Sequence, residues 1–188
     1  MINVCNIDIK SIPVLPTSPQ VPQWEHISAR FDTDYTDLKK SESTNILAIQ
    51  VREHLNNKYQ NHIKMFTDGS VLNSLDSGAG FVIPDLKVQK SFYLGKGFSV
   101  FTPELYAVLT ALNYICNIQL AIYNFVICVD SKSVLYALKN WNCSMRGDIF
   151  YEVKYLIHFI HTYTRVLGLS FVGYRLIVVF IGMKHQTN

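Results

Sequence analysis

Regular blocks of apolar residues begin after residue 62 of this chain, and they predict a series of strands. Ile63 to Thr67 predicts a short buried strand that ends at Asp68-Gly69-Ser70. Gly78 to Ile83 and Val88 to Leu94 predict two more strands. Pro84 between them favours a tight turn, so we expect a hairpin meander of three strands.

After residue 100 the apolar residues recur every three or four positions, which is the spacing of a helix. Thr102 is a predicted N-cap, Pro103 suits the first helical position and Glu104 suits the first turn. The apolar face of this helix comprises Leu105, Val108, Leu109 and Leu112. Tyr123 to Val129 is almost wholly apolar, which predicts a strand buried on both faces and closed by Asp130.

The remaining blocks complete an α/β pattern. Ser131 is positioned to cap a helix, a longer helix is predicted over 146–163, and Leu167 to Val172 predicts a final strand. The resulting order, β-β-β-α-β-α-α-β, predicts a mixed five-stranded sheet flanked by helices.

The first 61 residues have a different character. Four of the six prolines lie within the first 22 residues, which predicts an extended arm. Ile46, Ile49, Leu55 and Tyr59 fall at helical spacing, so we expect a connecting helix over 44–60. We therefore divide the chain into an arm with its helix (1–61), one domain (62–172) and a tail (173–188).

Composition excludes several classes of protein. The chain has 188 residues, of which 49% are hydrophobic and 16% charged, so it forms a core and is not disordered. Its four cysteines form no C-x-x-C pair, and no signal peptide is present, so we expect an intracellular protein in the cytoplasm or nucleus. The most apolar run, Leu176 to Ile181, is shorter than the roughly 20 residues that cross a bilayer, so no membrane partner is expected.

Three acids stand at the ends of predicted elements. Asp68 ends the first strand, Glu104 lies in the first turn of a helix and Asp130 ends the buried strand. Sites in α/β folds form at strand carboxyl ends and helix N-termini. Three carboxylates in one pocket would require a cation, and Mg²⁺ prefers oxygen ligands. Residues 61–188 contain eleven Lys or Arg and seven Asp or Glu, a net charge of +4 that permits a nucleic-acid partner.

The sequences around these acids also resemble a known family. The strings FTDGSVLNSLDSGAGFVI, FTPELYAVLTALNYI and FVICVDSKSVLYAL are similar to the type 1 ribonuclease H domain, in particular that of non-LTR retrotransposon reverse-transcriptase polyproteins. The resemblance covers residues 62–172, and NKYQNHIKMFTDGS looks like the segment that joins such a nuclease to its polymerase.

That resemblance implies a fold, an activity and a site. It implies a ribonuclease H-like fold and a hydrolase that cuts the RNA strand of an RNA–DNA hybrid, with Mg²⁺ or Mn²⁺ as cofactor. Asp68, Glu104 and Asp130 would be its catalytic residues and metal ligands. Gly69, Ser70 and Ser131 would contact the substrate, although turn and capping roles are open for the two serines. His158 and His161, at i and i+3, either bind a metal or lie on a partly exposed helix face.

The end of the chain departs from the family pattern. The family continues with a stretch close to W-[VI]-P-S-H-x-G-I-x-G-N-E-x-A-D, which supplies a histidine and a fourth acid on a final helix. This chain reads FVGYRLIVVFIGMKHQTN instead, so we expect the final helix to be missing. With permitted codons, one T restored after Ser170 changes the translation to FCWVPSHCGIYWNEAPD. We therefore infer a frameshift near Phe171 and expect impaired activity.

Three hypotheses about function are open at this point. The chain is an RNA–DNA hybrid endonuclease from a retroelement, a catalytically dead nucleic-acid-binding remnant of one, or another ribonuclease H-like enzyme that cuts DNA. The glutamate in the helix directly after the third strand argues against the last, because integrase-type sites have their glutamate late in the chain.

Overall fold

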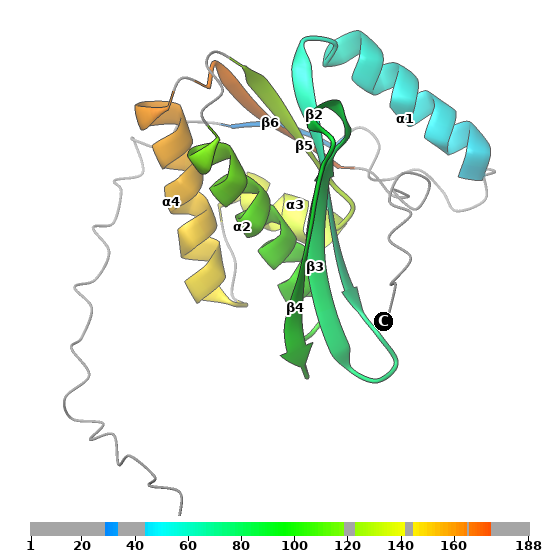
Figure 1. The fold of residues 1–188 in the computed structure, drawn as a ribbon, viewed down its shortest axis with the longest axis vertical. Helices are drawn as coiled ribbons and strands as arrows, with labels where there is room; N and C mark the ends of the chain where they lie inside the picture. The colour runs from blue at the N-terminus through cyan, green and yellow to red at the C-terminus, as the bar shows by residue number, and fades with distance from the viewer. Residues whose placement is uncertain (1–28, 34–43, 119–122, 142–144, 165, 174–188) are drawn as a thin grey trace, which may run out of the picture.

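The computed structural model describes residues 29–33, 44–118, 123–141, 145–164 and 166–173, which form one sheet with helices on both faces (Figure 1). The predicted arm before residue 29 and the tail after residue 173 lie outside the described residues. The strands are β1 (Arg30–Asp32), β2 (His62–Val71), β3 (Asp76–Ile83), β4 (Val88–Lys96), β5 (Asn124–Val129) and β6 (Gly168–Gly173). The helices are α1 (Thr44–Lys58), α2 (Phe101–Asn117), α3 (Lys132–Lys139) and α4 (Gly147–Tyr163), with a short 3₁₀ turn, η3 (Pro84–Leu86).

The sheet is mixed, as predicted, but it has six strands and not five. Its order is β1-β6-β5-β2-β3-β4, with antiparallel pairs in the β2–β3–β4 meander and parallel pairs elsewhere. The additional strand is β1, which pairs with β6 from Arg30 opposite Ser170 to Asp32 opposite Val172. Three residues are too few to show a period of two, so the sequence pattern could not reveal this strand.

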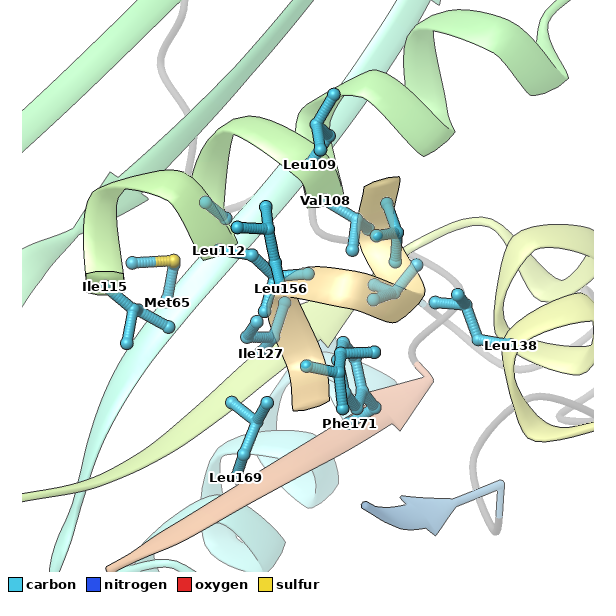
Figure 2. Close-up of a cluster of buried hydrophobic side chains, with 14 of the residues drawn as sticks. Met65, Val108, Leu109, Leu112, Ile115, Ile127, Leu138, Leu156, Leu169 and Phe171 are labelled. Carbon is cyan, nitrogen blue, oxygen red and sulfur yellow. The ribbon is translucent and has the colours of Figure 1, made fainter. Parts of the chain in front are cut away.

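The larger hydrophobic core lies between the sheet and helices α2, α3 and α4. Alternate residues of the parallel strands, such as Met65, Ile127 and Phe171, point into it and are fully buried. Figure 2 shows Val108, Leu109, Leu112 and Ile115 of α2 meeting Leu156 and these strand residues. The apolar face predicted for α2 is therefore confirmed.

Helix α1 covers the other face of the sheet through a smaller core. Leu55 and Tyr59 pack there against Phe66, Val126, Cys128 and Val172. The helix predicted over 44–60 is therefore confirmed, and Ile46 and Ile49, which helped to predict it, are more than half exposed. The end of α1 lies next to the start of β2, and its first turns extend away from that point (Figure 1).

The start of α2 also differs from the prediction. The helix begins at Phe101, and Val100 before it already has helical dihedral angles and no side-chain capping bond. Thr102 is not the N-cap, because its N–H donates to the carbonyl of Ser99 and its side chain lies buried inside the first turn. In the described residues, no helix is long and apolar enough to cross a membrane.

A buried aspartate joins β1 to α1. Oδ2 of Asp32 lies 2.9 Å from Nε2 of His54, 2.7 Å from Nζ of Lys58 and 3.3 Å from the hydroxyl of Tyr59. Burial and then the negative charge of Asp32 raise the pKa of Tyr59, so the hydroxyl keeps the proton that it donates. One carboxylate thus attaches three side chains at the end of α1 to the edge strand.

We predict that Asp32→Ala weakens the attachment of β1 to α1. The substitution leaves the buried donors of His54 and Tyr59 without this acceptor, which should lower the free energy of unfolding by about 1–3 kcal/mol. Urea denaturation of the full chain measures this change. Glu53→Ala is the control, because Glu53 lies on the exposed face of the same helix and should cost less than about 0.5 kcal/mol. Equal losses in the two variants would contradict the role given to Asp32.

Candidate active site

The register of two parallel strands brings Asp68 next to Asp130. β2 and β5 pair from His62 opposite Asn124 to Thr67 opposite Val129, and each acid follows the last pair directly. In-register residues of neighbouring strands project to the same side of a sheet. Phe66 and Cys128, two residues earlier, both belong to the smaller core on the α1 side. The structure therefore brings these two predicted site residues together.

Asp68 does not end its strand, which corrects the prediction from sequence. β2 continues to Val71, because its antiparallel pairing with β3 extends from Phe66 opposite Val82 to Val71 opposite Ser77. The parallel partner β5 stops at Val129. From Asp68 onward β2 is thus hydrogen-bonded to β3 only. The edge of β2 that faced β5 is no longer paired there, and the residues that follow β5 lie next to it.

Glycine at position 69 lets α2 approach this open part of β2. A Cβ atom at Gly69 would lie 2.2 Å from the backbone nitrogen of Glu104 and 2.4 Å from the carbonyl carbon of Pro103. These distances are impossible for a side chain, so only glycine permits the contact. The first turn of α2 is consequently pressed against β2, and Glu104 lies beside Asp68.

Glu104 is a buried acid that faces two other acids. Only 7% of its surface is exposed. Burial, followed by the negative charges of Asp68 and Asp130, raises the pKa of Glu104 to about 8, while a hydrogen bond from the Gly69 N–H acts in the opposite direction. Burial also raises the pKa of Asp68, again offset in part by Gly69. The three predicted acids therefore share one electrostatic environment, which we call the acid cluster (Asp68, Glu104 and Asp130).

The chemistry of the acid cluster suits a hard divalent cation. Carboxylate oxygens are the ligands of Mg²⁺ and Mn²⁺, and a cation would relieve the repulsion among the three acids. Oε2 of Glu104 is buried and has no hydrogen-bond partner, which leaves one ligand atom available. In the parts of the chain that the structure describes, however, no three His, Cys, Asp or Glu side chains are grouped tightly enough to hold a metal ion.

The predicted substrate-binding residues have three different surroundings. The backbone of α2 occupies the space next to Gly69 where a side chain would otherwise lie. Ser70 is half-buried in β2, opposite Gly78 of β3. Ser131 is the N-cap of α3, because its Oγ accepts a hydrogen bond from the N–H of Val134 at 3.4 Å. The capping role of Ser131 is confirmed, and substrate contact by these residues stays a prediction.

One residue near the acid cluster, Thr67, was not predicted from the sequence. Oγ1 of Thr67 donates to the carbonyl of Cys128 at 3.1 Å, in a fully buried bond between β2 and β5 directly before the two aspartates. The signal was a polar residue directly after the apolar pair Met65 and Phe66. His158 and His161 lie away from this cluster: His158 is half-buried with its ring 6.5 Å from that of Tyr163, and His161 is exposed.

We predict that Gly69→Ala disrupts the contact between β2 and α2. The added methyl group would overlap the backbone of Glu104, so α2 must move, at a cost of about 2–4 kcal/mol in the free energy of unfolding. Chemical denaturation measures the loss. Gly147→Ala is the matched control, because Gly147 begins α4 and a Cβ atom there would have no other atom within 4 Å. A variant at position 69 as stable as this control would contradict the close approach.

We predict that Glu104 makes the protein less stable as pH rises through neutrality. Its folded pKa of about 8 lies above the usual value of 4.5, so the unfolded chain loses this proton first and stability falls between those two pH values. Glu104→Gln should therefore gain, relative to the natural chain, on the order of 4–5 kcal/mol at pH 8.5 and nothing near pH 4. Denaturation midpoints measured with EDTA across this range test the prediction.

The exposed substitution Glu152→Gln on α4 is the control for this series, and we expect it to leave the pH dependence unchanged. A gain from Glu104→Gln that is the same at every pH would mean that Glu104 is not a buried acid with a raised pKa.

Comparison with known proteins gives no family for this chain. No protein-family model matches it, and no curated protein matches it either.

Proposed function

We propose that this protein is a ribonuclease H-like hydrolase that cuts the RNA strand of an RNA–DNA hybrid. One observation supports this proposal more than any other: Asp68, Glu104 and Asp130, from three separate elements, share one electrostatic environment around a buried carboxylate oxygen without a partner. The order of the elements and the three motif strings agree with the same family.

Each acid would have a definite part in the reaction. Asp68 and Asp130, on neighbouring strands, would hold Mg²⁺ or Mn²⁺ together with Glu104. When bound, such ions activate a water molecule and stabilise the leaving oxygen of a phosphodiester. Glu104 would exchange its proton for the cation, because its pKa of about 8 leaves it largely protonated at neutral pH. Thr67 would fix the spacing of β2 and β5 through its bond to Cys128.

The surface beside the acid cluster suits a nucleic-acid backbone. Helix α3 begins two residues after Asp130, and its Lys132 and Lys139 lie 5.5 and 5.9 Å from the ring centroid of Tyr136. Both lysines are exposed, and basic side chains of this kind bind nucleic-acid phosphates through their charge. Ser131 and Ser70 would contact the substrate from the cap of α3 and from β2. Shape and 2′-hydroxyl contacts, and not base sequence, would select the hybrid.

The last stretch of the chain lacks one acid of the family pattern. The family resemblance implies one beyond the last strand, and residues 173–188 contain no Asp or Glu. We therefore propose that the chain as written cuts slowly. Restoring one T after Ser170 would supply the missing motif, including its histidine and its acid.

We predict magnesium- or manganese-dependent cleavage of a labelled RNA–DNA hybrid by the frame-restored protein. Asp68→Asn and Asp130→Asn should each lower the rate about a hundredfold or more, because the reacting groups lose their alignment. Asp85→Asn is the control: Asp85 lies in η3 and accepts a bond from the N–H of Lys64, near the start of β2, so cleavage should be unchanged.

The written and frame-restored proteins are compared in the same assay, and a large gain is expected on restoration. Undiminished cleavage by Asp130→Asn would show that the site is assigned wrongly. Binding of the hybrid by both forms without cleavage by either would favour the alternative of a catalytically inactive nucleic-acid-binding module. Cleavage of double-stranded DNA in preference to the hybrid would favour a DNA-cutting relative.

A further inference from the structure

The outer face of α4 has a row of exposed aromatic rings that no role in the acid cluster explains. Tyr151, Tyr155 and Tyr163 are 62%, 57% and 70% exposed, and the half-buried Phe159 lies between the last two in the sequence. The rings of Tyr155 and Phe159 are 6.1 Å apart, and those of Phe159 and Tyr163 are 5.4 Å apart. We call these four residues the aromatic row. Several exposed aromatic side chains along one helix are typical of a binding surface.

The charges near the aromatic row disfavour a phosphate ligand. Arg146 at the start of α4 forms a two-pronged ion pair with Asp148, at 3.0 and 2.6 Å. Lys154 donates to the carbonyl of Trp141 at 2.8 Å and lies against the ring of Phe150. Both basic side chains are thus engaged within the domain, and exposed Glu152 adds a negative charge. The row itself offers rings and hydroxyl groups.

Rings with hydroxyl groups are the surface that recognises proline-rich segments. Such segments form a polyproline II helix, whose backbone carbonyls are free to accept hydrogen bonds and whose proline rings pack on aromatic side chains. Four prolines of this chain, Pro13, Pro16, Pro19 and Pro22, are spaced by three residues each. A polyproline II helix has three residues per turn, so these four rings would share one edge.

The dimensions of the two surfaces agree. Tyr151 and Tyr163 are twelve residues apart on a helix, or about 18 Å. Pro16 and Pro22 are six residues apart, or about 19 Å in the polyproline II conformation.

The arm also joins the domain near the C-terminal end of α4, where Tyr163 of the aromatic row lies. Ala29 is buried in the larger core together with Ile157 and Ile160 of α4. β1 begins level with the start of β6, which follows the end of α4 after a short connection (Figure 1). Pro22 and Ala29 are seven residues apart, and this length of chain can span up to about 23 Å. The prolines can therefore reach the row without strain.

We propose that the proline-rich segment of this chain, Pro16 to Pro22, docks on the aromatic row of α4 in the same molecule. This inference does not depend on the candidate active site. Because the segment is tethered, weak contacts suffice: an effective concentration of about 1 mM and an intrinsic dissociation constant of about 0.1 mM leave it free roughly one tenth of the time.

The test is the rate at which proteinase K cleaves the arm of the full chain, followed by mass spectrometry. We expect Tyr155→Ala with Tyr163→Ala to accelerate cleavage about tenfold, because the segment is then always free. Tyr93→Ala is the matched control, since Tyr93 is 72% exposed on β4, at the opposite edge of the sheet, and its loss should change nothing. Thermal melting of each variant verifies that the domain is folded.

A double-mutant cycle makes the test specific for proline. In a chain with Pro16→Ala, Pro19→Ala and Pro22→Ala, the two tyrosine substitutions should have no further effect, whatever the intrinsic cleavage rate of that arm. If the two tyrosine substitutions accelerate cleavage equally in the proline-substituted chain, the proposal is overturned. It is also overturned if they cause no acceleration in the chain with its natural arm. Protection that falls on tenfold dilution would overturn it too, because the segment would then come from a second copy.

Discussion

The approach of α2 to β2 at Gly69 is the constraint on which the candidate site depends. Any side chain at this position would overlap the backbone of Glu104, so the glycine allows the first turn of α2 to rest directly on the strand. That contact brings a helix acid beside Asp68, while the register of β2 and β5 supplies Asp130. The site is thus assembled from backbone geometry, and the acid side chains occupy positions that strands and helix have already defined.

This arrangement has a cost in stability. A buried carboxylate next to two others destabilises the folded chain at neutral pH, and the packing around it must offset that penalty. The buried bond from Thr67 to Cys128 and the larger core beneath α2 lie directly next to the acids and provide such support. On the other face, Asp32 holds β1 and α1 to the sheet through His54, Lys58 and Tyr59. Strongly shifted acids in a well-packed surrounding are a common property of active sites.

The elements with a strong periodic pattern could be predicted from sequence, and those fixed by distant contacts could not. Helix α4 and strand β5 agree with the expected ranges to within about a residue, because burial imposes their patterns. β1 was missed because its three residues are ordered by β6, far away in the chain. Thr102 looked like an N-cap, but Val100 is already helical and the threonine is buried. The three acids were identified from motif strings, whereas their mutual burial and the raised pKa of Glu104 follow only from the packing at Gly69.

Calorimetric titration of the full chain with Mn²⁺ tests the central claim, that the acid cluster binds a divalent cation, most directly. At pH 7 Glu104 is largely protonated, because its pKa is about 8, so an ion bound by its carboxylate must displace that proton. Titrations in buffers of different ionisation enthalpy should therefore show release of close to one proton per ion at pH 7 and almost none above pH 9. Glu104→Gln should abolish the release and weaken the binding. Saturable binding without proton release, or binding that Glu104→Gln leaves unchanged, would contradict the account.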